Sequence, residues 1–138
     1  MTAPQTMPAP IVGARKLLVV MSDLLFRSKI DEVARRLGLE LRVAKSPEQL
    51  DRQLAAGEPA IAIVDLEETS LDPFAAIARV RDAAPQTPIL GFAGHGNVEA
   101  IKRAREGGAT VLARSGFTVQ LPALLTEIAE RERARVTG

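Results

Sequence analysis

Asp65 ends an apolar run and begins an acidic one, in the segment "AIAIVDLEETS" at residues 60–70. At such a position a carboxylate could act as a nucleophile, bind a cation or cap backbone donors at the end of a strand. Glu67 and Glu68 follow closely. Their charges could help to collect a cation, but repulsion between neighbouring carboxylates also raises carboxyl pKa values. We therefore interpret the two glutamates as part of a solvated acidic loop.

Arg114 follows the last short apolar run, "ATVLA" at residues 109–113. Its guanidinium could pair with Asp65 through charge-assisted hydrogen bonds and so hold one conformation of the site. A structure that placed the two charged groups far apart would contradict this hypothesis.

His95 is the single histidine and lies in the glycine-rich segment "GFAGHGN" at residues 91–97. An acid–base role would need a nucleophile or a second ligand nearby in the sequence, and none is present. The glycines run G-x-x-G-x-G rather than in the dinucleotide-binding order. A surface turn explains both features, although the helix start that follows could hold an anion.

The composition excludes several classes of protein. The chain has 138 residues, 46% of them hydrophobic and 25% charged, which is typical of one soluble globular domain. A net charge of +1 and only 3% aromatic residues argue against nucleic-acid binding. Cysteine is absent, so no disulfide or thiol nucleophile exists. Without a signal-like or membrane-spanning segment, we expect a cytoplasmic protein with no membrane contact.

Hydrophobic patterns alternate between two periods along the chain. Apolar runs predict strands at 16–21, 60–65, 88–93 and 109–113, and the alternating "LELRV" predicts a half-exposed strand at 39–43. Helical spacing follows each strand. The helices are marked by a stripe from Phe26 to Leu37 that ends at Gly38, a capping box at Ser46 and Gln49, a start at Asp72 and Pro73, a helix from Asn97 to Gly107, and a last stripe from Leu121 to Ile128.

Strict alternation of strands and helices predicts an α/β fold of three layers, α/β/α, around a parallel sheet. The half-exposed second strand belongs at an edge, which favours the flavodoxin-like, doubly wound order 2-1-3-4-5. We expect residues 1–14 to be a flexible leader, residues 15–131 to form the domain and residues 132–138 to be a tail. In such sheets, chemistry takes place beyond the carboxyl ends of the first and third strands, which is where Asp65 lies.

Over residues 15–130 the element order resembles the response-regulator receiver family, as do the runs "PAIAIVDLE", "TPILGFAGHGNVEAIKRAREGGAT" and "VLARSGF". The resemblance implies that Asp65 occupies the position that accepts phosphate. It places the acid pair that holds magnesium on Met21 and Ser22, with Asp23 one residue later. The hydroxyl-bearing switch position falls on Ala93, and the lysine position falls on Arg114.

Most of these positions depart from the pattern of the family. Met21 cannot bind a hard cation, Ser22 is a weak neutral ligand and Ala93 has no hydroxyl group. Arg114 keeps a positive charge but has a planar fork. The resemblance is therefore to an atypical member, a pseudo-receiver with a degraded site, for which we expect no enzymatic activity, catalytic residue, cofactor or resident metal.

Three functions remain open at this point. The leading one is a stand-alone signalling module that binds a protein partner, either a kinase or another signalling protein. The alternative is a true receiver of a two-component phosphorelay, phosphorylated on Asp65, with magnesium held weakly by Asp23 and Asp65. A small-molecule site at the strand ends has no positive signal. The family resemblance also implies that the fourth helix, last strand and last helix bind partners or form a homodimer, where Val98, Ile101 and Ala104 predict a thinly buried helix.

Overall fold

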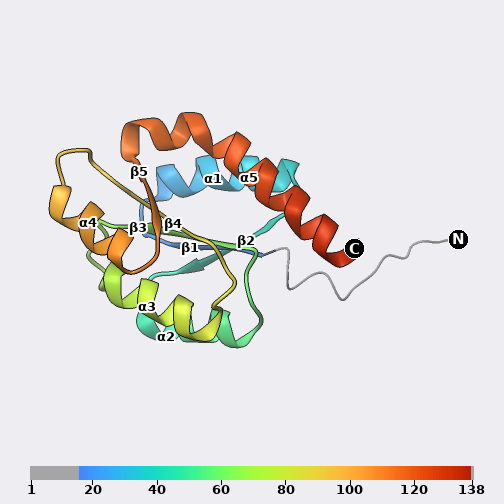
Figure 1. The fold of residues 1–138 in the computed structure, drawn as a ribbon, viewed down its shortest axis with the longest axis horizontal. Helices are drawn as coiled ribbons and strands as arrows, with labels where there is room; N and C mark the ends of the chain where they lie inside the picture. The colour runs from blue at the N-terminus through green and yellow to red at the C-terminus, as the bar shows by residue number, and fades with distance from the viewer. Residues whose placement is uncertain (1–15, 138) are drawn as a thin grey trace, which may run out of the picture.

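The computed structural model describes residues 16–137, in which five strands alternate with five helices (Figure 1). The expected leader at residues 1–14 lies outside this range. In chain order the elements are β1 (Lys16–Val20), α1 (Leu24–Arg36), β2 (Glu40–Ala44), α2 (Pro47–Ala55), β3 (Ile61–Asp65), α3 (Pro73–Ala83), β4 (Ile89–Ala93), α4 (Val98–Glu106), β5 (Thr110–Ala113) and α5 (Arg114–Thr137).

All neighbouring strands are parallel and follow the order β2-β1-β3-β4-β5, which confirms the predicted flavodoxin-like topology. The register keeps the carboxyl ends close to level, because Val20 lies beside Val64 and Asp65 lies beside Phe92. Parallel strands need a crossover between them, and here each crossover contains a helix. The loops that leave β1, β3, β4 and β5 therefore meet at one edge of the sheet.

Two hydrophobic cores cover the two faces of the sheet. Successive side chains of a strand point to opposite faces, so Leu18 and Val20 pack with α2, α3 and α4, while Leu17 and Val19 pack with α1 and α5. Figure 1 shows the same division, with α1 and α5 on one side of the sheet and α2 and α3 on the other. The central strand β3 is buried along its whole length, whereas β2 is half-exposed, as its alternating sequence predicted.

The predicted helix starts at Ser46, Asp72 and Asn97 are present, with one change in detail. Each accepts a backbone N–H of the helix that it begins, and Asp23, which was not predicted as a cap, does the same for α1. The predicted capping box is incomplete, because Gln49 accepts the backbone N–H of Lys45 at 2.8 Å instead of the one of Ser46.

The last two helices differ from the sequence pattern. Val98 was expected in the buried stripe of α4 but is 70% exposed, and Ala100 and Ala104 are buried instead. Val98 points outward because the buried face of α4 is formed by Ala100 and Ala104, which are four residues apart and lie on another side of the helix. α5 begins at Arg114, directly after β5, and continues to Thr137 through the segment interpreted as a tail. Among residues 16–137, no helix is long and apolar enough to cross a membrane.

Candidate functional site

Asp65 is the last residue of β3 and has only 6% of its surface exposed. Its Oδ1 accepts the backbone N–H of Glu67 at 2.9 Å and a guanidinium N–H of Arg114 at 3.2 Å. Burial raises the pKa of the Asp65 carboxyl above its usual value, because desolvation disfavours the charged form. The bonds from Glu67 and Arg114 offset only part of that increase.

Arg114 is the first residue of α5, and it bridges two carboxylates with one nitrogen. Its Nη2 donates to Asp65 Oδ1 at 3.2 Å and to Glu67 Oε1 at 2.9 Å. The predicted ion pair between Arg114 and Asp65 is thus present. Burial alone would lower the pKa of Arg114, but the two carboxylates raise it overall. The site therefore contains a permanent positive charge.

Two phenylalanine rings lie close to this guanidinium, and a third ring packs against both of them. The Arg114 Cζ is 4.9 Å from the ring centre of Phe92 and 5.5 Å from that of Phe26. Phe117 completes the cluster, 4.7 Å from Phe92 between ring centres, and both of these rings are fully buried. A flat guanidinium can stack on such rings while its edge still donates to carboxylates. The aromatic cluster thus lies on the other side of the guanidinium contacts and helps to position Arg114 beside Asp65 and Glu67.

Glu67 connects the loop after β3 with the loop after β4. Its Oε1 accepts from Arg114, and its Oε2 accepts from the backbone N–H of Gly94 at 3.3 Å and from the side-chain amide of Asn97 at 3.1 Å. The hydrogen bonds from Arg114 and Asn97 lower the pKa of the Glu67 carboxyl. Glu67 is therefore an ionised anion held by three donor residues, two in the loop after β4 and one at the start of α5.

Glu68 is buried, with 8% of its surface exposed, and binds the end of β1. Its two carboxylate oxygens accept the backbone N–H and the hydroxyl of Ser22, at 2.7 and 2.8 Å, and the backbone N–H of Ser70 at 3.1 Å. Burial would raise the pKa of Glu68, but the bonds from Ser70 and Ser22 together lower it to about 2. The interpretation of Glu67 and Glu68 as a solvated acidic loop is wrong for Glu68, which is buried, whereas Glu67 is exposed although protein donors bind its carboxylate.

The positions that would hold magnesium do not fit that ion in this arrangement. Met21 is fully buried in the core shared with α1 and α5, Ser22 is bound to Glu68, and Asp23 caps α1 by accepting the N–H of Phe26 at 3.0 Å. Within residues 16–137, no three metal-binding side chains gather as a cation site. The Oδ1 atoms of Asp23 and Asp65 thus each accept from separate protein donors in this arrangement.

The remaining predicted positions have simple surroundings. Ala93 is fully buried at the end of β4 and offers only a methyl group, and His95 is exposed in the turn before α4, as predicted.

Sequence reasoning missed the aromatic cluster. The sequence did contain a signal for this cluster. The chain has only four phenylalanines, and two of them, Phe92 and Phe117, lie before and after Arg114 in the sequence.

Comparison with known proteins gives one consistent result. No protein-family model and no curated sequence matches the chain. A candidate response regulator from Chloroflexus aurantiacus J-10-fl is 27% identical with a TM-score of 0.71, over 84% of this chain and 98% of that one. A CheY-like receiver domain protein from Methanospirillum hungatei JF-1 is 12% identical with a TM-score of 0.73, over 88% of this chain and 98% of that one.

A third solved structure carries a modified site. It is a response regulator protein from Burkholderia pseudomallei with a phosphorylated aspartic acid, a calcium ion and citrate. It is 22% identical with a TM-score of 0.70, over 88% of this chain and 72% of that one. The structures that resemble this chain are therefore response-regulator receiver domains, and the comparison supports a response-regulator type of signalling module.

Proposed function

We propose that this chain is a pseudo-receiver that signals by binding a protein partner, with a centre held in one state by its own charges. The observation that carries this proposal is the bridge of Arg114 between Asp65 and Glu67. A guanidinium in contact with two carboxylates supplies the positive charge that a metal ion would otherwise bring. The pair therefore stabilises one arrangement of the loops without phosphorylation.

The surroundings of Asp65 oppose phosphoryl transfer. A phosphoryl group brings several negative charges, and a metal ion normally spreads them in the transition state. Here Asp65 lies near the carboxylates of Glu67 and Glu68, and their donors are already occupied. Asp65 also ionises less readily than a free aspartate. An incoming phosphate would have to displace Glu67 from Arg114, Gly94 and Asn97 at once.

The alternative function is a true receiver of a two-component phosphorelay, phosphorylated on Asp65. Its support is the location of Asp65 at the carboxyl end of β3, in a fold shared with a response regulator that carries a phosphorylated aspartate. In that case the loop after β3 would rearrange, and Asp23 and Asp65 would bind magnesium.

The partner surface that we propose comprises α4, β5 and α5, for a kinase, another signalling protein or a second copy of the chain. Two large apolar side chains support it, since Val98 on α4 is 70% exposed and Val119 on α5 is 80% exposed. Exposed apolar side chains of this size favour contact with another protein. α4 is also held thinly, by Ala100, Ala104 and the half-buried Ile101.

One experiment separates the two functions. The chain is incubated with a small phosphodonor and magnesium, its intact mass is measured, and Asp65→Asn serves as the control. The proposal predicts no phosphate-sized gain in mass. A gain that the Asp65→Asn variant lacks would establish the alternative. Magnesium titration followed by backbone NMR gives a second test, because saturable shifts at Asp23 and Asp65 in the millimolar range would also favour phosphorylation.

A further inference from the structure

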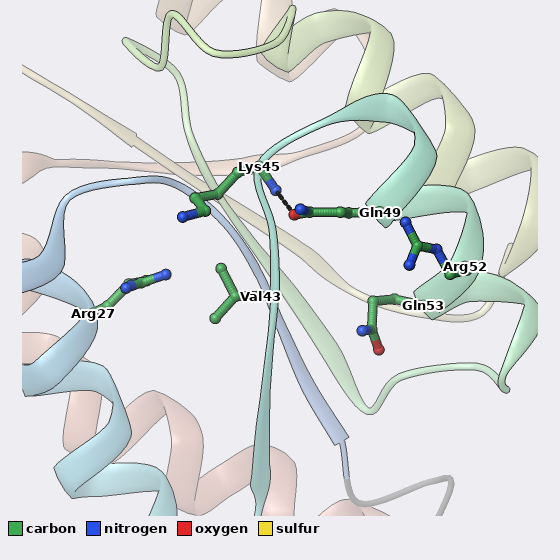
Figure 2. Close-up of a pocket in the computed structure, with 6 residues that line it drawn as sticks. All are labelled: Arg27, Val43, Lys45, Gln49, Arg52 and Gln53. Atoms are coloured by element: carbon green, nitrogen blue, oxygen red, sulfur yellow. Dashed lines mark hydrogen bonds between the residues drawn. The ribbon is translucent and has the colours of Figure 1, made fainter.

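We propose a second site, separate from the Asp65 centre, that binds a small molecule carrying two or more phosphate charges. It is a hollow of about 310 Å³ at the β2 edge of the sheet, lined by Arg27, Val43, Lys45, Gln49, Arg52 and Gln53. Figure 2 shows that these side chains come from α1, from the end of β2 and from α2, with Arg27, Val43 and Lys45 on one side of β2 and Gln49, Arg52 and Gln53 on the other as drawn. None of them takes part in the Asp65 centre.

The lining is positively charged and contains no carboxylate. Arg27, Lys45 and Arg52 contribute three formal charges. Within residues 16–137, none of the three side chains forms a hydrogen bond or an ion pair. Six other arginines of the described part of the chain form ion pairs, namely Arg35, Arg36, Arg42, Arg79, Arg114 and Arg131, whereas Arg81, Arg103 and Arg105 form none. Cations gathered without counter-charge repel one another, and a bound anion removes that repulsion.

Several acids on or beside the same elements are used elsewhere. Asp51 of α2 pairs with Arg79 of α3, Asp31 of α1 pairs with Arg35, and Asp23 caps α1. Glu40 of β2 pairs with Arg42. Glu48 of α2 is the exception, but it does not line the hollow, and no acid among residues 16–137 forms an ion pair with Arg27, Lys45 or Arg52.

Gln49 makes the hollow richer in donors. Its Oε1 accepts the backbone N–H of Lys45 at 2.8 Å, as the dashed line in Figure 2 shows. That bond fixes the amide group, so its Nε2 remains as a donor. Two guanidinium groups, one ammonium and the side-chain amides of Gln49 and Gln53 then line the hollow. Donors in this number match an anion with many acceptor oxygens, and guanidinium forks suit phosphate in particular.

The size and lining of the hollow limit the chemical class of the ligand further. A volume of about 310 Å³ is at the small end for ligand pockets, which favours a small molecule over a folded partner. The lining holds no aromatic ring on which a nucleobase could stack. Val43 provides one apolar wall. The ligand class is therefore a compact polyphosphate or a bisphosphorylated small molecule without a base.

The test measures binding of inorganic pyrophosphate to the full chain by calorimetry, with backbone NMR to locate it, at low salt and without magnesium. We expect saturable binding that weakens as salt rises, with shifts at Arg27, Lys45 and Arg52. Arg27→Gln and Arg52→Gln should each weaken binding about tenfold, as expected for the loss of a charge-assisted hydrogen bond. Arg105→Gln is the matched control, because Arg105 is an exposed arginine of α4 outside the hollow.

Three results would overturn the proposal. The first is a lack of saturable pyrophosphate binding to the unmodified chain. The second is an equal loss of affinity in Arg27→Gln and Arg105→Gln, which would show a general response to charge. The third is tighter binding of a short glutamate peptide than of pyrophosphate, which would assign the hollow to an acidic protein segment. Folded NMR spectra of each variant ensure that lost binding does not reflect unfolding.

Discussion

Glu68 and Ser22 join the loop after β3 to the end of β1, because the carboxylate accepts both the backbone N–H and the hydroxyl of Ser22. A glutamate three residues after Asp65 thus occupies the space next to the first strand, where the family resemblance placed metal-binding acids. The acidic charge of the site has moved from β1 to the loop after β3. There it is satisfied by protein donors.

Replacing Glu68 by glutamine should change how stability depends on pH. The pKa of Glu68 is about 2 in the fold and lies near 4.5 in an unfolded chain, so its stabilising effect is complete above pH 4.5 and is lost as pH falls towards 2. At pH 7 Glu68→Gln should cost on the order of 2 kcal/mol, and the cost should shrink between pH 4.5 and 2. Urea unfolding across this range measures both. The exposed Glu106→Gln is the control, and a cost that stays constant with pH would contradict the prediction.

Asp65→Asn should change the stability of the fold in the opposite direction to Glu68→Gln. Burial raises the pKa of this carboxyl, so its ionised form costs the fold stability above the raised value, and protonation relieves that cost as pH falls. At pH 7 the asparagine variant should be as stable as the unmodified chain or more stable, with the difference fading below about pH 4. The side-chain oxygen of the asparagine can still accept the N–H of Glu67. Thermal unfolding at several pH values measures this, and marked destabilisation at pH 7 would refute it.

Arg114→Lys should lower stability although the charge is kept. Lysine cannot stack flat on Phe92 and Phe26 while reaching both carboxylates, so we expect a loss of about 1 kcal/mol. Urea unfolding at pH 7 gives the value. Arg131→Lys is the matched control, since Arg131 forms an exposed pair with Glu127 that contacts no ring among the described residues. Equal effects of the two substitutions would show that stacking contributes nothing.

Glu67→Gln should loosen the turn before α4 without unfolding the chain. The substitution removes the charge that holds the N–H of Gly94 and the amide of Asn97. Amide hydrogen exchange at Gly94 should become about fivefold faster, which corresponds to about 1 kcal/mol of local stability. Exchange in β3 should stay unchanged. Glu58→Gln, at an exposed loop position, controls for the loss of charge. If exchange at Gly94 stayed unchanged, Glu67 would not be the residue that connects the two loops.

The fold could be predicted from the sequence because each element carries its own local signal. The alternation in "LELRV" placed β2 at the sheet edge, and Ser46 and Asn97 marked helix starts that the structure contains. The error at Val98 arose because α4 has so few apolar residues that two helical faces fit the pattern almost equally well. Hydrophobic periodicity is a weak guide to the buried face of a helix with so few apolar residues.

The site was predictable only in part. Arg114 and Asp65 could be paired because Asp65 ends β3 and Arg114 directly follows the end of β5, at the same edge of the parallel sheet. Glu67 and Glu68 could not be placed, because the direction of a loop side chain depends on the path of the loop and on donors far away in the sequence. Ser22 is separated from Glu68 by 46 positions, and no periodicity links them.

The absence of a connecting segment between β5 and α5 gives the molecule a mechanical property. Arg114 both contacts the carboxylates and begins a helix of 24 residues, about 36 Å long, that packs on α1 (Figure 1). Pro122 lies inside this helix and removes one helical backbone hydrogen bond, so the turns after it are not one uniform rod with the first turn. The first turn of α5 and the Arg114 contacts with Asp65 and Glu67 nevertheless belong to one continuous segment. We therefore expect a partner that moves this first turn to disturb the contacts of Arg114, and a change at the Asp65 centre to alter binding of that partner in return.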